Sequence, residues 1–289
     1  MQNYTIEKSM GGYEISRDSC KKLDFIVNSG LCRANPYYPL ESRTINVYHE
    51  HTLKPLIEKG IISDGSNSPF DDRKMRYDKI EFRSESSTFS KFYLSVYLGH
   101  SNFLEYLEKK ERSKKTTETL VKMGKAFYND PHAFFPRNPG VTGIVLTSDK
   151  KLVVGERQVG EKDRYEGLLQ AVAGHLTYKV NPKDINLEEE MLRETMEEVG
   201  ISKSKVSRLE FLGLYSDPSI AGDDLDFCYL INTNIHSDYF KSGKWKENVK
   251  VAEHKEFLLI DGYNKTNNLV RTGNFNGKNW NIIFSTRGL

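Results

Sequence analysis

Arg193, Glu194, Glu197 and Glu198 combine residue types and spacing that suit catalysis. In a helix, residues three and four apart share a face, so Glu194 would lie beside both other glutamates. Carboxylates on one face repel each other by roughly a few tenths of a kcal/mol per pair. A divalent cation such as Mg²⁺ reverses that repulsion, because it prefers carboxylate oxygens and leaves room for substrate phosphates. The alternative is a solvated acidic face on which Arg193 forms a surface ion pair.

The segment 187–201 has the pattern of an amphipathic helix that would carry these side chains. Asn186 can act as its N-cap, with Glu189 three residues later, and Gly200 supplies a stop. A core-facing stripe falls on roughly the opposite side of the helix: Leu187, Met191, Leu192, Thr195 and Val199.

Strand patterns surround the predicted helix. A turn at residues 148–149 joins the first two strands into a hairpin, and Gly174 and His175 are expected to open a loop before the helix. We expect an α+β sandwich, with a mixed sheet between helices. The predicted strands span residues 141–146, 152–157, 168–173, 206–215, 226–232 and 256–260.

The first 130 residues are less regular. Strands are predicted at 78–83 and 92–98, and helices at 52–58, 101–114 and 117–127. The segment 130–140 contains three prolines and reads as a linker packed by Phe134 and Phe135. We therefore expect a smaller N-terminal α+β domain at 1–130, whose role the sequence does not reveal, a linker at 131–140 and a second domain at 141–289.

Composition excludes several classes of function. The chain has 289 residues, with 42 basic and 40 acidic side chains and a net charge of +2, which is no footprint for nucleic acid. No apolar run approaches the roughly 18 residues that cross a bilayer, and the N-terminus lacks a signal peptide. Cys20, Cys32 and Cys228 have neither metal nor redox spacing, so we expect reduced thiols and a cytoplasmic protein.

The run from Arg193 to Ile201 resembles the second half of the Nudix box, Arg-Glu-apolar-x-Glu-Glu-x-Gly-apolar. Every charged position and the glycine are present, whereas Thr195 occupies an apolar position. The hairpin and the glycine turn before the helix also match the order of elements in the Nudix fold.

The first half of the box departs from the family pattern. Val172-Ala173-Gly174 replaces Pro-Gly-Gly, and five additional residues lie between the glycine and the arginine. Ile185 replaces the glutamate that normally precedes the arginine by eight residues, which leaves Asp184 or Glu190 as a stand-in. Because that glutamate mostly orients the loop, the departure concerns loop geometry more than metal binding.

A narrower resemblance is to the two-domain branch of animal Nudix proteins that split UDP-glucose. It is carried by Gly167 to His175, by the lengthened loop after it, and by shorter matches at Tyr97-Leu-Gly, Arg157-Gln-Val, Leu212-Gly-Leu, Ser219-Ile-Ala-Gly and Glu253-His254.

The resemblance implies roles for individual residues. Glu194, Glu197 and Glu198 would hold Mg²⁺ or Mn²⁺, and Arg193 would orient them. Outside the box, Glu253 is the preferred candidate for a base or further ligand. Candidate substrate-binding residues are Arg157, Gly174 and His175. The alternatives to Glu253 are Asp223, Asp224, Asp226 and Glu256.

The implied reaction is metal-dependent hydrolysis of the pyrophosphate bond of a nucleoside diphosphate sugar. UDP-glucose or UDP-galactose would yield UMP and a sugar 1-phosphate. Two alternatives stay open: an ADP-ribose or dinucleotide pyrophosphatase, and a Nudix-derived nucleotide sensor without turnover. The sequence predicts neither a nucleic-acid partner nor a membrane partner, and it leaves the oligomeric state open.

Overall fold

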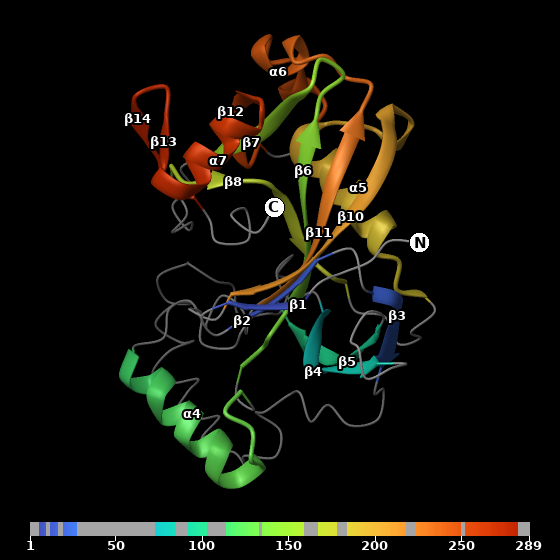
Figure 1. Cartoon of the computed structure of the whole chain (residues 1–289), viewed down its shortest axis with the longest axis vertical. Coiled ribbons are helices and arrows are strands. Elements are labelled where there is room, and N and C mark those ends of the chain that lie inside the picture. The colour runs from blue at the N-terminus through green and yellow to red at the C-terminus, as the bar shows by residue number, and fades with distance from the viewer. Residues whose placement is uncertain are drawn as a thin grey trace, which may run out of the picture.

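Within the residues that the computed structural model describes, nine strands form one mixed sheet (Figure 1). The described residues are 6–9, 12–16, 20–27, 73–84, 92–102, 114–132, 135–158, 167–177, 184–217, 224–249 and 252–282. The sheet contains, in spatial order, β1 (Ile6–Ser9), β2 (Gly12–Ser16), β10 (Val206–Asp217), β11 (Asp224–Thr233), β6 (Pro139–Leu146), β7 (Lys151–Arg157) and β12 (His254–Asp261).

Two further short strands pair with strands β7 and β6 of this sheet. β8 (Leu169–Gln170) pairs with β7, and β9 (Val172–His175) pairs with β6. β11 and β6 run parallel, whereas β6 and β7 form the predicted antiparallel hairpin. Gly174 and His175 therefore lie in a strand, and the expectation that they open a loop is wrong. Their backbones pair with β6 through Val141 and Gly140.

A second sheet has three strands, in the order β3 (Cys20–Val27), β5 (Phe92–Asn102) and β4 (Arg73–Ser84). The strands predicted at 78–83 and 92–98 are thus confirmed, and both are longer than expected. β5 includes residues 101 and 102, so the helix predicted from residue 101 is wrong at its start, and residues 103–113 lie outside the described part. The prediction at 52–58 also lies outside it.

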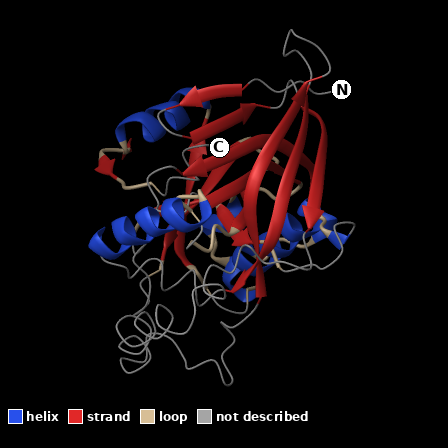
Figure 2. Ribbon diagram, turned by 90° about the horizontal axis from the view of Figure 1, so that it is seen from below, coloured by secondary structure: helices blue, strands red, loops and turns tan. Residues whose placement is uncertain are grey.

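Helices lie on both sides of the strands (Figure 2). The predicted helix at 117–127 is confirmed as α4 (Lys114–Tyr128), and the box helix is α5 (Leu187–Val199). The later elements are α6 (Asp238–Lys241), α7 (Tyr263–Thr272), the 3₁₀ turns η3 (Lys203–Lys205) and η4 (Lys244–Glu247), and the hairpin of β13 (Asn274–Phe275) with β14 (Lys278–Asn279). With the mixed sheet, these elements confirm the predicted α+β class. None of the described helices is long and apolar enough to span a membrane.

Caps fix the ends of α5 as the sequence predicts. The Asn186 side chain accepts a hydrogen bond from the Glu189 backbone N–H at 3.1 Å. At the other end, Gly200 adopts φ 67°, a left-handed conformation that glycine reaches without steric cost. Both ends of the helix that carries the box are therefore set by local sequence.

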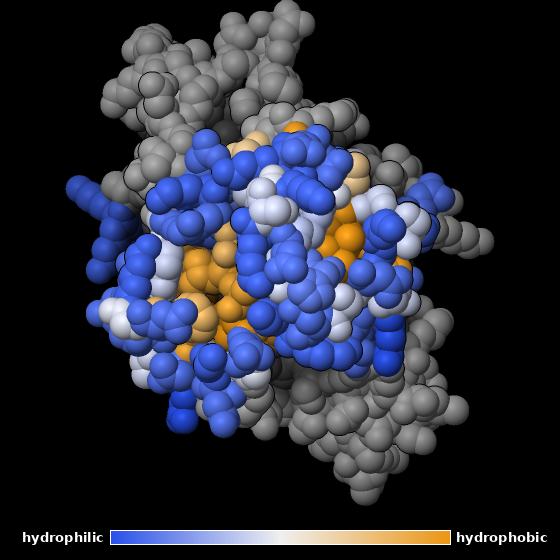
Figure 3. All heavy atoms as spheres, turned by 90° about the horizontal axis from the view of Figure 1, so that it is seen from above, coloured by the Kyte–Doolittle hydropathy of each residue, from blue (hydrophilic) through white to orange (hydrophobic). Residues whose placement is uncertain are grey.

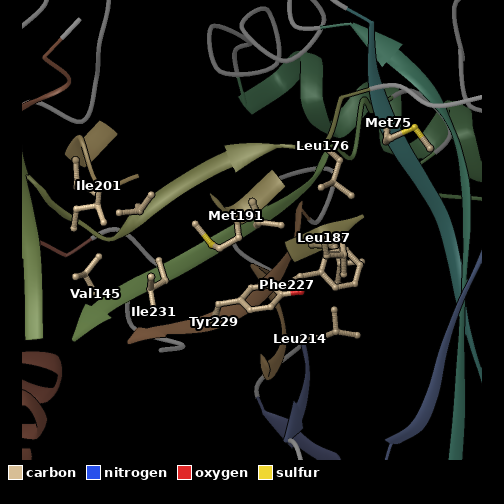
Figure 4. Packing of buried hydrophobic residues seen from close by; sticks show 14 of the residues in the cluster. Met75, Val145, Leu176, Leu187, Met191, Ile201, Leu214, Phe227, Tyr229 and Ile231 are labelled. Atoms are coloured by element: carbon tan, nitrogen blue, oxygen red, sulfur yellow. The ribbon is translucent and has the colours of Figure 1, made fainter. Parts of the chain in front are cut away.

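The larger hydrophobic core lies between α5 and the sheet, where Met191 packs toward Val145 and Ile231 (Figure 4). Gly143 in β6 allows this close approach, because a Cβ there would lie 2.7 Å from Met191 Sδ. A smaller core that includes Val154 and Leu258 covers the other face of the sheet. On the outer surface shown in Figure 3, hydrophilic residues cover most of the described area.

The proposed linker packs against β4. The Arg137 carbonyl accepts from the Tyr77 N–H at 3.0 Å, and Phe135 is buried with its carbonyl bonded to Arg76 Nε at 2.8 Å. Phe134 lies outside the described residues. The boundary at residue 130 remains a prediction, although β1 and β2 belong to the same sheet as the C-terminal strands. Cys228 is buried and not disulfide-bonded, as expected.

Candidate active site

Arg193 gathers the acidic side chains of α5 around one guanidinium. Its Nε and Nη2 donate to Glu190 Oε2 at 3.1 and 2.9 Å, and its Nη1 donates to Glu197 Oε2 at 2.7 Å. Nη2 also contacts Glu194 Oε1. The surrounding carboxylates raise the pKa of Arg193 although burial opposes this. Glu190, one of the two predicted stand-ins for the missing box glutamate, thus pairs with the box arginine, whereas Asp184 is exposed.

The helix does not present its glutamates equally to solvent. Glu194 and Glu198 are buried, with only 8% and 2% of their surface exposed, whereas the Glu197 side chain is 57% exposed. Burial raises the pKa of Glu194 to about 8, against the attraction of Arg193, and repulsion from Glu198 adds to the rise. Two of the three predicted ligands therefore lie against the sheet, where an unneutralised carboxylate is costly.

β9 forms the floor on which these two carboxylates lie. A Cβ on Gly174 would lie 1.8 Å from Glu194 Oε1, so any side chain there would displace the glutamate. The Ala173 backbone N–H points to Glu198 Oε1 at 3.4 Å. Strand alternation places the His175 side chain on the face of β9 away from Glu194. Gly174 thus makes room for a site carboxylate, and its predicted contact with substrate remains a prediction.

His254, at the start of β12, contacts Glu198 directly and was not among the predicted site residues. Its Nε2 lies 3.1 Å from Glu198 Oε2, and His254 is fully buried. Burial, together with the nearby Arg157 cation, lowers the pKa of His254 to about 4, so the ring is neutral near pH 7. Burial also raises the pKa of Glu198 well above its usual value, and the Glu253 carboxylate adds to this rise.

Arg157 and Glu253, predicted separately as a substrate-binding residue and as a base or further ligand, form an ion pair. Arg157 Nη1 donates to Glu253 Oε2 at 2.5 Å. Arg157 lies opposite His254 in the pairing of β7 with β12. The structure therefore brings three elements, β7, β12 and α5, together around Glu198.

The other carboxylates considered outside the box lie at scattered positions. A Cβ on Gly140 would lie 2.8 Å from Asp226 Oδ1, so Asp226 packs against the start of β6. Asp224 begins β11, and Glu256 is exposed on β12. Asp223 lies outside the described residues. Among the described members of this group, Glu253 raises the pKa of Glu198 through the repulsion of its carboxylate.

No protein-family model and no curated protein matches the chain. Among solved structures, it is similar to the NUDIX domain of Shewanella oneidensis NrtR complexed with ADP ribose. That likeness has 18% identity and a TM-score of 0.31, and it covers 48% of this chain and 81% of that one. A Bacillus subtilis pyrophosphohydrolase, BsRppH, matches with 23% identity over 48% of this chain and 70% of its own, at a TM-score of 0.29.

A third similar structure is a C. elegans Ap4A hydrolase, with 12% identity over 42% of this chain and 79% of that one, at a TM-score of 0.26. Each of these likenesses covers less than half of this chain at low identity and low TM-score, so none identifies a substrate or a mechanism for it.

The donor set on α5 fits a divalent cation in chemical type. Glu194, Glu197 and Glu198 offer the oxygens that Mg²⁺ and Mn²⁺ prefer, and the raised pKa of buried Glu194 marks a place where added positive charge is favourable. In the described part of the chain, no three acidic, histidine or cysteine side chains are gathered as a metal cluster. Arg193 instead holds Glu194 and Glu197, so a cation requires these side chains to rearrange.

Proposed function

We infer that this chain is a divalent-metal-dependent Nudix pyrophosphohydrolase acting on a nucleoside diphosphate sugar, with UDP-glucose or UDP-galactose as the leading substrates. The supporting observation is the excess of negative charge at α5. Glu190, Glu194 and Glu197 all contact one cation, Arg193. Glu198 is buried one turn from Glu194, and no described ion pair joins it to Arg193. A helix that buries two such carboxylates favours a cation-binding role over a solvated acidic face.

Each residue of the proposed site would have a distinct role in hydrolysis. Glu194, Glu197 and Glu198 would hold Mg²⁺ or Mn²⁺, which when bound supplies charge neutralisation and a more acidic water. Arg193 keeps the glutamates in place through its fixed fork of donors. Glu253, whose charge raises the pKa of Glu198, would be the base or further ligand outside the box, and it forms an ion pair with Arg157.

The preference for a UDP-sugar has a separate basis from the hydrolase proposal. It comes from the sequence resemblance around Gly167 to His175, at Arg157 and at Glu253-His254. Hydrolysis would release UMP and a sugar 1-phosphate.

The test is turnover by the full chain with Mg²⁺, monitored by chromatography of the nucleotide products. UDP-glucose, UDP-galactose, ADP-ribose and dinucleotides are compared under identical conditions. We expect UMP release from the UDP-sugars, reduced about a hundredfold or more in Glu198→Gln. Glu188→Gln is the matched control, because Glu188 is an exposed glutamate in the first turn of the same helix.

Three outcomes contradict parts of the proposal. Cleavage of ADP-ribose or of dinucleotides alone overturns the sugar assignment and leaves the hydrolase assignment standing. Nucleotide binding without turnover, under both Mg²⁺ and Mn²⁺, overturns the enzyme assignment in favour of a sensor. Equal turnover in Glu198→Gln and Glu188→Gln would show that Glu198 of the box helix takes no part in catalysis.

A further inference from the structure

His254 is buried at a point where its ring has little freedom to move. A Cβ on Gly155 would lie 2.1 Å from His254 Nδ1, so the ring lies directly over that glycine. On another side, the His254 and Phe257 ring centroids are 5.0 Å apart, and Phe257 itself packs edge-on against Trp245 at 4.7 Å. The ring is therefore held by packing before any ligand arrives.

A bulge in β12 is what brings this ring to the helix side of the sheet. His254 pairs with Arg157, and Glu256 pairs with Glu156, so Lys255 is an extra residue on β12. If the same residues paired regularly, without the bulge, alternation would place His254 on the same face as Leu258, in the smaller core. With it, His254 shares the face of Gly155 and Phe257, toward α5. Bulges frequently re-aim a side chain in this way near functional sites.

The two ring nitrogens differ in their surroundings. Nε2 lies 3.1 Å from Glu198 Oε2, whereas Nδ1 is buried and has no hydrogen-bond partner among the described residues. A buried N–H without an acceptor is rarer and costlier than a bare lone pair on a ring that packs against carbon. The single proton of the neutral ring therefore belongs on Nε2, where Glu198 accepts it.

Glu198 consequently has a protein donor for each oxygen. The Ala173 N–H from β9 points at Oε1, and the His254 ring from β12 contacts Oε2. Two such donors fix the rotation of a carboxylate about its last bond, and each oxygen retains a further lone pair for a cation.

We propose that His254 is a positioning residue for Glu198, whose Nε2–H holds the carboxylate in the orientation in which it binds a divalent cation. The proposal rests on the cation-binding role of Glu198 put forward above. His254 itself contacts neither the cation nor the substrate, and it acts only through Glu198.

The first measurement tests the hydrogen bond with Mg²⁺ present, which is diamagnetic and favours the ionised Glu198 carboxylate as acceptor. In ¹⁵N-labelled full-length protein, the His254 ring is expected to be the Nε2–H tautomer, which has a protonated Nε2 and a bare Nδ1. Its signals are assigned by their loss in His254→Gln, among the seven histidines of the chain. A protonated Nδ1 with bare Nε2 would overturn the proposal.

The second measurement is Mn²⁺ binding by electron paramagnetic resonance, with Mn²⁺ alone as the probe. His254→Gln places an amide nitrogen near the position of Nε2, whereas His254→Asn places one near Nδ1. We expect the asparagine variant to bind Mn²⁺ about tenfold more weakly and the glutamine variant to recover most of that loss. Equal weakening in both variants indicates a packing role only, and unchanged binding in His254→Asn excludes positioning.

Glu198→Gln separates this proposal from the one it rests on. If Glu198→Gln leaves Mn²⁺ binding unchanged, the proposed function of the box fails. If Glu198→Gln abolishes Mn²⁺ binding while His254→Asn retains wild-type affinity, the box assignment stands and the positioning role of His254 is wrong.

Discussion

Gly174 and Glu194 occupy adjoining space so closely that a Cβ on the glycine would lie 1.8 Å from the glutamate Oε1. The glycine lies in β9 and the glutamate in α5, so the contact joins the two elements of the site. Packing against Glu194 therefore explains why position 174 is a glycine, without reference to a substrate.

Gly174→Ala is expected to destabilise the protein by about 1–3 kcal/mol, because overpacking forces neighbouring atoms to shift. The cost should shrink in a Glu194→Ala background, where the clashing oxygen is absent, so the two changes should be strongly non-additive. Urea unfolding of the four proteins in this cycle measures the coupling. Additive changes would mean that the glycine is needed for a reason other than Glu194.

Glu190→Gln tests whether Glu190 takes the place of the missing box glutamate. Glu190 binds Arg193 through two nitrogens, so its loss of charge should loosen Arg193 and reduce Mg²⁺-dependent turnover about tenfold. Glu189→Gln is the control, because exposed Glu189 pairs only with Lys203 among the charged groups described. An equal effect of both changes would point to the general charge of the helix instead of this pairing.

Asp149 supports a prediction on acid stability away from the site. Its carboxylate accepts from the Ser237 N–H at 2.9 Å and from Ser237 Oγ at 2.7 Å. Although desolvation opposes it, these hydrogen bonds hold the pKa of Asp149 well below its usual value of 3.8. Because the folded pKa is depressed, the stabilisation is fully present above that usual value and is lost as the pH falls below it.

Asp149→Ala should therefore lower the free energy of unfolding by about 2 kcal/mol at pH 7, and the difference from wild type should shrink as the pH falls below about 4. Urea unfolding at a series of pH values measures this. Asp261→Ala, at an exposed carboxylate on the end of β12, should show little difference at any pH. A deficit in Asp149→Ala that does not change with pH would show that packing, and not the ionised hydrogen bonds, is responsible.

The parts of the structure that follow from the sequence are those with local causes. Asn186, Glu189 and Gly200 set the ends of α5 through backbone hydrogen bonds and a left-handed φ, and these signals involve neighbours in the chain. The β6–β7 hairpin follows for the same reason, from alternating strands around a short turn. The box spacing likewise places Arg193 within reach of Glu190 and Glu197 on its own helix.

The remaining features depend on contacts between distant segments. Burial of Glu194 and Glu198 requires β9, which continues as a strand through Gly174 because β6 supplies its pairing partner. The approach of Arg157 to Glu253 joins positions 96 residues apart. Neither the burial of these glutamates nor the Arg157–Glu253 ion pair leaves a hydrophobic period or a turn motif in the sequence. His254 was not predicted as a site residue, because the strand predicted at 256–260 begins after it and alternation from Leu258 would assign it to the wrong face. The Glu253-His254 match was the signal for it in the sequence.

Lys255 offers a direct test of that point, because it is the extra residue of the bulge. Deleting Lys255 should restore regular pairing of β12 with β7 and leave His254 opposite Arg157, on the face of Gly155 and Phe257, because the deletion moves His254 one position closer to Leu258. The hydrogen bond to Glu198 would then be retained, and Mn²⁺ binding should stay near that of wild type, in contrast to the loss of about tenfold expected in His254→Asn. Lys255→Ala keeps the bulge and removes only an exposed side chain whose Nζ lies 3.7 Å from Glu156 Oε1, so it should bind Mn²⁺ as wild type does. Weak Mn²⁺ binding in the deletion, with the His254 ring no longer contacting Glu198 by NMR, would show that the strand re-forms its bulge at another residue and turns His254 away. Weak binding in Lys255→Ala would instead show that the lysine charge, and not the added length of backbone, matters to the site.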